Sequence, residues 1–304
     1  MKQKRNQYLA IAAFALMLAA CNKNAQEPQG GNEESSTDIS ESVSAAGNKY
    51  LSRVLFEDFT GAWCGYCPRL GYKFDLLEDN NPRFIFVGNH NGDAFETSYQ
   101  NTLENEFKVN GFPTGIKMRD WKTSTSPVKF ADNGSVTNMS DTSQASAYLN
   151  SNDSLGLSIS NAAISGNTVS GKVKVAFGFT YSEPLQIVIE LVESNLVLAQ
   201  SNYYNSSPVG NPFYQKGNPI TNYVHNNVLR KVSTATLGDA IPSTKTTAGK
   251  TFTKSFSFDA TGYNKANCKV IAFVVGQKTN TKYKGIVNVQ WAQAGQNKAF
   301  EIVN

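Results

Sequence analysis

Two cysteines with two residues between them lie between a segment typical of a strand and a segment typical of a helix. Residues 63–68 read Trp-Cys-Gly-Tyr-Cys-Pro and follow the mostly apolar run 54–59. After them, apolar residues recur at the i, i+4, i+7 spacing of one helix face, at Leu70, Phe74 and Leu77. The apolar run 83–87 predicts a second strand. The order strand, helix, strand favours a βαβ unit with a parallel strand pair.

A C-x-x-C motif in this position is typical of a thiol–disulfide redox site. Cys64 would sit at the helix N-terminus, where the helix dipole favours the thiolate. Cys67, one turn inside the helix, would be less exposed and would attack a mixed disulfide held on Cys64. A zinc site needs four ligands, and the sequence has no second Cys pair and no His-x-x-x-His. We therefore expect no metal. The alternative interpretation, that the Cys64–Cys67 disulfide is idle, is not excluded by the sequence.

Three features in this order resemble the thioredoxin family. The segment 59–67 is similar to the thioredoxin active-site segment, Asp58 matches its buried acid, and the Gly-Phe-Pro-Thr of residues 111–114 matches the stretch around its cis-proline. The resemblance implies that Asp58 carries a proton and that Pro113 aligns the substrate. It implies an attacking thiolate and a resolving thiol at the two cysteines, and no cofactor. The substrate-contacting residues that we expect are Trp63, Tyr66 and Phe112.

The N-terminal residues predict a secreted, lipid-anchored protein. Residues 2–5 are charged, residues 8–18 are apolar, and Leu18-Ala19-Ala20-Cys21 resembles a bacterial lipobox. We expect a lipoprotein signal peptide at residues 1–20, lipidation of Cys21, and a flexible polar tether at residues 21–48. Without its three leader bases, the chain has 25 of its 28 bases against 24 acids. A net charge near +1 gives no long-range attraction to nucleic acid.

Alternation with a period of two dominates the second half of the chain. In residues 172–179 the apolar side chains fall on one face. Further strands are expected at residues 185–192, 223–232, 251–258, 268–275 and 285–291. Such short strands favour an immunoglobulin-like β-sandwich. The expected fold is thus an α/β thioredoxin-like domain at residues 49–150, followed by an all-β immunoglobulin-like sandwich domain at residues 153–304.

Four further features are candidates for function, each with a plainer interpretation. His90 follows a predicted strand and could tune the thiolate, but a loop histidine is the simpler interpretation. His225 has no metal-ligand partner four residues on, so we expect a structural role. Cys268 opens an apolar strand and is expected to be a buried free thiol. The aromatic-rich segment 202–222 is either a binding surface or a loop that packs over the sandwich edge.

The chain as a whole resembles one family more closely than thioredoxin. The lipobox, the polar tether, the lead-in 55–61 to the Cys pair and the later Tyr-Val-His-Asn-Asn-Val-Leu-Arg of residues 223–230 are similar to the Omp-twenty-eight-related outer-membrane lipoproteins of Bacteroidetes. This resemblance implies a lipid-anchored protein on either face of the outer membrane.

Two hypotheses follow for the function. The first is thiol–disulfide exchange on envelope proteins that carry cysteines or disulfides. The alternative is a non-enzymatic binding module with a static Cys64–Cys67 disulfide, in which the aromatic segment 202–222 makes the contacts.

Overall fold

The computed structural model describes residues 46–123, 126–130, 149, 152–206, 211–277 and 284–303. Within these ranges the chain is mostly β-strand, with two α-helices, α1 (Cys67–Asn80) and α2 (Gln100–Glu106). Two short 3-10 helices, η1 (Ser243–Lys245) and η2 (Lys265–Asn267), complete the helical elements of this part. None of the helices in the described ranges has the length and apolarity to cross a membrane.

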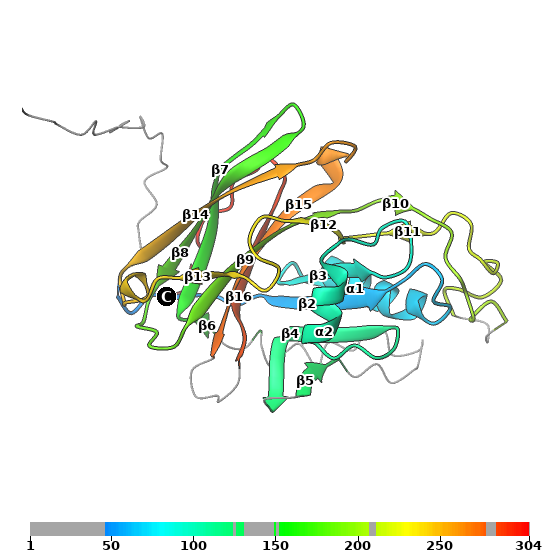
Figure 1. Cartoon of the computed structure of the whole chain (residues 1–304), viewed down its shortest axis with the longest axis horizontal. Helices are drawn as coiled ribbons and strands as arrows, with labels where there is room; N and C mark the ends of the chain where they lie inside the picture. The colour runs from blue at the N-terminus through cyan, green and yellow to red at the C-terminus, as the bar shows by residue number, and fades with distance from the viewer. Residues whose placement is uncertain are drawn as a thin grey trace, which may run out of the picture. The chain divides into compact units, whose positions relative to one another are not determined.

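The largest sheet has the strand order β16-β15-β9-β12-β3-β2-β4-β5, with β13 paired to β9 (Figure 1). The strands β2, β3 and β12 run parallel to one another, and the other pairs are antiparallel. The bounds are β2 (Val54–Thr60), β3 (Phe84–His90), β4 (Thr114–Thr123), β5 (Ser126–Lys129), β9 (Leu185–Glu193), β12 (Val228–Val232), β13 (Asp239–Ile241), β15 (Cys268–Gln277) and β16 (Lys284–Gln293).

Three smaller sheets accompany the large one. The first has the order β14-β8-β7 and packs its apolar face against β9 and β15 (Figure 1). The other two have the order β17-β1-β6 and the pair β10-β11. The bounds are β1 (Lys49–Leu51), β6 (Asn152–Asp153), β7 (Leu155–Ser165), β8 (Thr168–Phe177), β10 (Leu196–Val197), β11 (Val224–His225), β14 (Thr251–Asp259) and β17 (Ile302–Val303).

The expectation of an α/β thioredoxin-like domain followed by an all-β immunoglobulin-like sandwich domain is wrong. β12, from the second half of the chain, pairs in parallel with β3 from the first half, with Val228 opposite Gly88. The Gly88 N–H also donates to the carbonyl of Asn227 at 2.9 Å. Strands from both halves therefore form one continuous sheet. This excludes a fold in which the first half forms a sheet separate from that of the second half.

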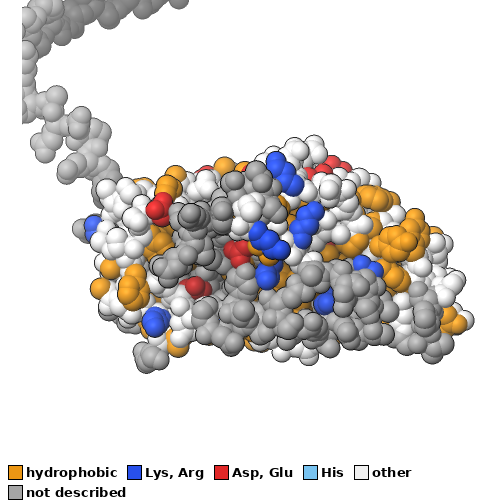
Figure 2. All heavy atoms as spheres, turned by 90° about the horizontal axis from the view of Figure 1, so that it is seen from below, with side chains coloured by type: hydrophobic (Ala, Val, Ile, Leu, Met, Phe, Trp, Pro, Cys, Tyr) orange, Lys and Arg blue, Asp and Glu red, His pale blue; other side chains and the backbone are white. Residues whose placement is uncertain are grey.

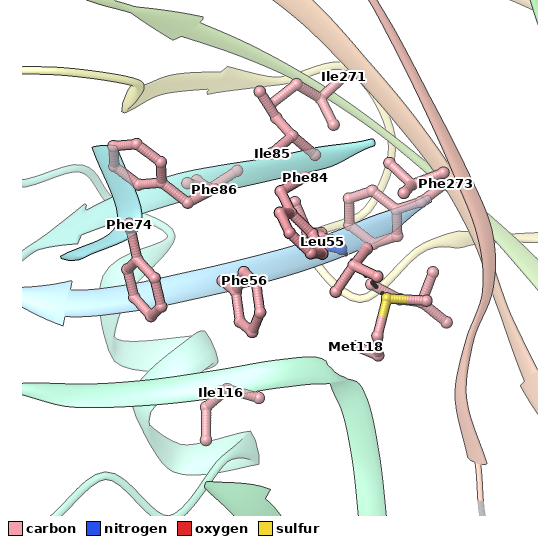
Figure 3. Close-up of a cluster of buried hydrophobic side chains, with 14 of the residues drawn as sticks. Leu55, Phe56, Phe74, Phe84, Ile85, Phe86, Ile116, Met118, Ile271 and Phe273 are labelled. Carbon is pink, nitrogen blue, oxygen red and sulfur yellow. Dashed lines mark hydrogen bonds between the residues drawn. The ribbon is translucent and has the colours of Figure 1, made fainter. Parts of the chain in front are cut away.

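One hydrophobic core also spans both halves of the chain. Phe273 of β15 lies close to Leu55 of β2 and Met118 of β4 (Figure 3). The Leu55 N–H donates to the Met118 sulfur at 3.1 Å. On the α1 side of the same core, the rings of Phe56 and Phe74 stack at 5.0 Å. Burial of apolar side chains from both halves stabilises the joined sheet, because each half covers surface that the other would expose.

The two central strands β9 and β15 are buried on both faces. In β15, Ile271 and Phe273 face the shared core, whereas Val270, Ala272 and Val274 face the β14-β8-β7 sheet. A strand covered on both faces is apolar throughout instead of alternating. The uniformly apolar run 270–275 predicts a central strand, and the structure confirms it.

The predicted strand–helix–strand unit is also confirmed. β2 and β3 are parallel, with Val54 opposite Phe84, and α1 connects them. The apolar stripe of Tyr99, Leu103 and Phe107 predicts a helix over 93–109, which the structure limits to α2. The sequence also predicts a strand over 114–118, and β4 extends through Thr123. The leader and the tether up to residue 45 lie outside the described residues, as does most of a helix that the sequence predicts over 141–149.

Candidate functional site

A disulfide joins Cys64 and Cys67 at the start of α1, with their Cα atoms 5.4 Å apart. α1 begins at Cys67 itself and has Pro68 in its first turn, so Cys67 does not lie one turn inside the helix as expected. Both cysteines are buried, with 4% of Cys64 and 1% of Cys67 exposed. Their neighbours Trp63 and Tyr66 are 49% and 53% exposed. The disulfide thus lies just under a surface formed by aromatic rings.

The aromatic neighbours connect the cysteine loop to two other loops. The Trp63 ring lies edge-on to Phe112 at 5.4 Å, and its Nε1 donates to the Asn91 carbonyl at 2.7 Å. The bond between Phe112 and Pro113 is cis, as the resemblance implied. On the other side, the Tyr66 ring lies edge-on to Tyr203 at 5.0 Å. The three residues expected to contact a substrate therefore lie around the disulfide together with Pro113.

Asp58 lies beneath the disulfide, on β2. It is buried and lines a cavity of about 30 Å³ together with Cys67 and both histidines, His90 and His225. The remaining lining includes Thr60, Asp75, Gln200 and Tyr223. Asp58, the expected proton carrier, and Cys67, the expected resolving cysteine, thus line the same small polar cavity. Both histidines line it as well.

His90 is a buried residue at the end of β3, opposite Thr60 of β2, and not an exposed loop residue. Its Nδ1 lies 2.7 Å from Oδ2 of Asp93, which also accepts the Ala62 N–H at 2.7 Å. Burial acts to raise the pKa of the Asp93 carboxyl, but the hydrogen bond and charge of His90 hold it below its usual range. The Asp93 carboxylate therefore bridges His90 and the backbone of the cysteine loop.

Residues 200–203, which we call the cover segment, lie over the cysteine loop. The Ser201 N–H donates to the Ala62 carbonyl at 2.8 Å, and the Tyr203 N–H donates to the Gly65 carbonyl at 3.0 Å. The Gln200 amide donates to the Cys64 carbonyl at 2.9 Å. The cover segment is the main part of the site that the sequence does not predict, because pairs between residues 136 to 139 positions apart have no local signal.

The rest of the aromatic-rich loop between β10 and β11 packs against α1 (Figure 1). Tyr204 and Phe213 are buried next to Tyr72 of the helix. Asn202 holds the loop closed by donating to the carbonyls of Phe213 and Gly217 at 3.0 and 2.9 Å. The loop covers α1 and the disulfide and does not pack over a sandwich edge, whereas its role as a binding surface stays a prediction.

Cys268 is a buried free thiol, as predicted. Burial, and then the charge of Glu193, raise the pKa of Cys268 to about 12, so it is a thiol at neutral pH. Among the described residues, no group of three His, Cys, Asp or Glu side chains is arranged to hold a metal ion.

The buried carboxyl of Asp75 on α1 should make the free energy of unfolding depend on pH. Burial raises the pKa of its carboxyl to about 7, although a hydrogen bond from Asn226 opposes the shift. An acid with a raised folded-state pKa stabilises the fold fully below its unfolded pKa, and this contribution is lost as pH rises toward 7. We expect Asp75→Asn to raise the free energy of unfolding at pH 8 by roughly 1–2 kcal/mol, since partial exposure reduces the full effect.

Urea unfolding at pH 4, 6 and 8 measures this effect. The difference between Asp75→Asn and the wild type should vanish near pH 4 and grow toward pH 8. Asp79→Asn, on the exposed side of the same helix, is the matched control. A pH-independent difference for Asp75→Asn would show that the carboxyl ionises normally in the folded protein.

Comparisons with known proteins agree with this fold. One similar solved structure is HBP35 of Porphyromonas gingivalis, with a TM-score of 0.59 and 18% identity over 80% of this chain and 76% of that chain. At this identity the likeness shows a shared fold alone. No curated protein matches the chain.

The family model described as Outer membrane protein Omp28 matches residues 100–298. The match covers more than half of the chain and begins after the disulfide at residues 64–67. The chain therefore belongs to the Omp28 family of outer membrane proteins, and its place is the outer membrane.

Proposed function

We propose that this outer-membrane protein performs thiol–disulfide exchange on envelope proteins through its Cys64–Cys67 pair. The observation that carries the proposal is the cavity that Cys67 shares with the buried carboxyl of Asp58. A leaving or attacking thiol needs a nearby group that takes and returns its proton. The start of α1 adds a helix dipole that favours thiolate at the same place.

In the proposed reaction a substrate thiolate attacks the sulfur of Cys64, the more exposed of the two cysteines. The Cys64–Cys67 bond breaks, Cys67 leaves as a thiolate, and Asp58 supplies its proton. A second substrate thiolate then attacks the substrate sulfur of the mixed disulfide, the bond to Cys64 breaks, and Cys64 leaves as a thiolate. The substrate pair is then oxidised and the protein pair is reduced. The reverse sequence reduces a substrate disulfide, and which direction dominates depends on the partner's reduction potential.

The surface around the disulfide fits a polypeptide partner. Trp63, Tyr66 and Tyr203 are exposed aromatic residues there, and Phe112 and Pro113 lie beside Trp63. Hydrophobic side chains gather at the right-hand end of the face in Figure 2, the end at which Figure 1 draws the loop between β10 and β11. We propose that a lipid on Cys21 anchors the protein and that its partners are envelope proteins with cysteines or disulfides.

One observation favours the alternative function, a binding module with a static disulfide. The cover segment donates hydrogen bonds to the carbonyls of Ala62, Cys64 and Gly65, which holds the cysteine loop in place. If the cover segment never moves away from the cysteine loop, no partner thiol can reach the disulfide, and the disulfide is static.

Trapping in cells separates the two functions. A Cys67→Ser variant cannot resolve a mixed disulfide, so substrates should remain attached to Cys64 and appear as discrete adducts on non-reducing gels. The matched control is the double variant that also replaces Cys64, in which the adducts should disappear. Absence of adducts from the single variant would contradict exchange and favour the static disulfide.

A further inference from the structure

The two histidines of the chain lie side by side near the disulfide, although they are 135 positions apart in the sequence. The rings of His90 and His225 lie 5.0 Å apart. Phe95 contacts both rings, at 5.2 and 5.4 Å, and Tyr223 contacts His225 at 4.9 Å. His225 therefore contributes to the disulfide site from the Tyr-Val-His-Asn-Asn segment of the second half.

The cavity that His225 lines is polar and has room for a water molecule. Its volume of about 30 Å³ exceeds the roughly 10–15 Å³ that one water needs. His225 is only 6% exposed, and its buried Nε2 has no hydrogen-bond partner among the described residues. A buried nitrogen on a polar cavity is satisfied when a water occupies the cavity.

His225 is a neutral side chain near neutral pH. Burial, and then the charge of His90, lower the pKa of His225 to about 4, while a hydrogen bond with the Leu198 backbone and the charge of Asp93 act in the opposite direction. A neutral imidazole has one nitrogen that accepts a hydrogen bond. The titratable groups that face it are His90 and Asp93 near the end of β3, Asp58 on β2, Cys67 and Asp75 on α1, and Tyr223 beside it.

We infer that His225 positions a water through which Cys67 and Asp58 exchange a proton. The inference rests on the thiol–disulfide exchange proposed above. When Cys67 resolves a mixed disulfide, its thiol gives a proton to the water, and the water gives a proton to the Asp58 carboxylate. The Cys67 sulfur then attacks the Cys64 sulfur, the Cys64–Cys67 bond forms, and the substrate leaves as a thiolate. His225 accepts a hydrogen bond from the water and does not itself change its charge.

Single-turnover oxidation of the reduced full-length protein by glutathione disulfide separates the two chemical steps. Samples are quenched with a maleimide and analysed by peptide mass spectrometry, which measures the glutathione adduct on Cys64 and the closed pair. In His225→Leu we expect attack by Cys64 at the wild-type rate but closure about tenfold slower, with a steeper dependence on pH between 6 and 9. His225→Gln retains an acceptor oxygen and should close nearly as fast as the wild type.

Two further variants control for packing. Phe95→Leu changes the contact with both histidine rings without removing a polar atom, and should close within about twofold of the wild-type rate. His225→Phe is a second variant without an acceptor and replaces His225→Leu if that variant does not fold.

The outcomes distinguish this inference from the function on which it rests. Closure of the non-accepting variant at the wild-type rate, or equal slowing in His225→Gln, would overturn the positioning role while exchange stands. A wild-type protein that forms no glutathione adduct would overturn the proposed function as well.

Discussion

Replacing Arg119 with methionine should lower the free energy of unfolding by about 3–5 kcal/mol, because it leaves buried carboxylates without their cation. Arg119 of β4 donates to both carboxylate oxygens of Glu57, at 2.9 and 2.6 Å, and lies 3.3 Å from Glu190. All three side chains are buried. Burial raises the pKa of Glu190 to about 7, and Arg119 opposes that rise, so its removal destabilises the ionised form further.

This ion cluster also connects the parts of the sheet. Glu57 precedes Asp58 on β2, whereas Glu190 belongs to β9. The guanidinium also lies 4.6 Å from the centre of the Phe273 ring of β15. A loss of 3–5 kcal/mol corresponds to a melting temperature lower by roughly 10 °C in a chain of this size.

Urea unfolding followed by circular dichroism measures the change. Lys254→Met is the matched control, since it removes one partner of the half-exposed pair between Lys254 and Asp239 and should cost less than 1 kcal/mol. Adding Glu57→Gln to Arg119→Met should recover part of the loss. Equal effects of Arg119→Met and Lys254→Met would contradict the account of this cluster.

Replacing Gly65 with alanine should expose the disulfide. A Cβ atom on Gly65 would lie 2.3 Å from the Tyr203 ring, so the ring must move away. The move disrupts the contact between Tyr66 and Tyr203 and strains the hydrogen bond from the Tyr203 N–H. Such contacts together contribute about 1.4 kcal/mol or more, which corresponds to a tenfold or greater increase in the rate of reduction by dithiothreitol.

Gly111→Ala is the matched control for this prediction. No atom lies within 4 Å of the Cβ that this change adds, and the position is also in a loop near the disulfide. Its rate of reduction should stay within about twofold of the wild type. If Gly65→Ala were reduced no faster than Gly111→Ala, the cover segment would not limit access to Cys64.

The local elements were predictable because their signals are local. The period of Leu70, Phe74 and Leu77 predicts α1, and the uniformly apolar run 270–275 predicts a strand buried on both faces. A resemblance over residues 58–67 and 111–114 identified the cysteine loop and the cis bond before Pro113. The structure places these residues around the disulfide, and their roles in a functional site stay predictions.

The joining of the two halves was not predictable from the same signals. The parallel pairing of Val228 with Gly88 depends on tertiary contacts. The segment 223–232, which forms β11 and β12, would have the same sequence pattern as a strand of a separate sandwich. For the same reason the sequence around His225 indicates only a structural role, and no local signal predicts the cover segment. Local pattern sets each strand, whereas the shared core decides which strands are neighbours.

The reduction of the wild-type disulfide in native buffer tests the central claim most directly. The rate at which millimolar dithiothreitol opens the Cys64–Cys67 pair is measured by alkylation and peptide mass spectrometry, which separates this pair from Cys268. If the pair exchanges with partners, the native protein should be reduced at a rate that does not change with urea below the unfolding transition. Reduction that occurs only as the protein unfolds would show a static disulfide and contradict the proposed function.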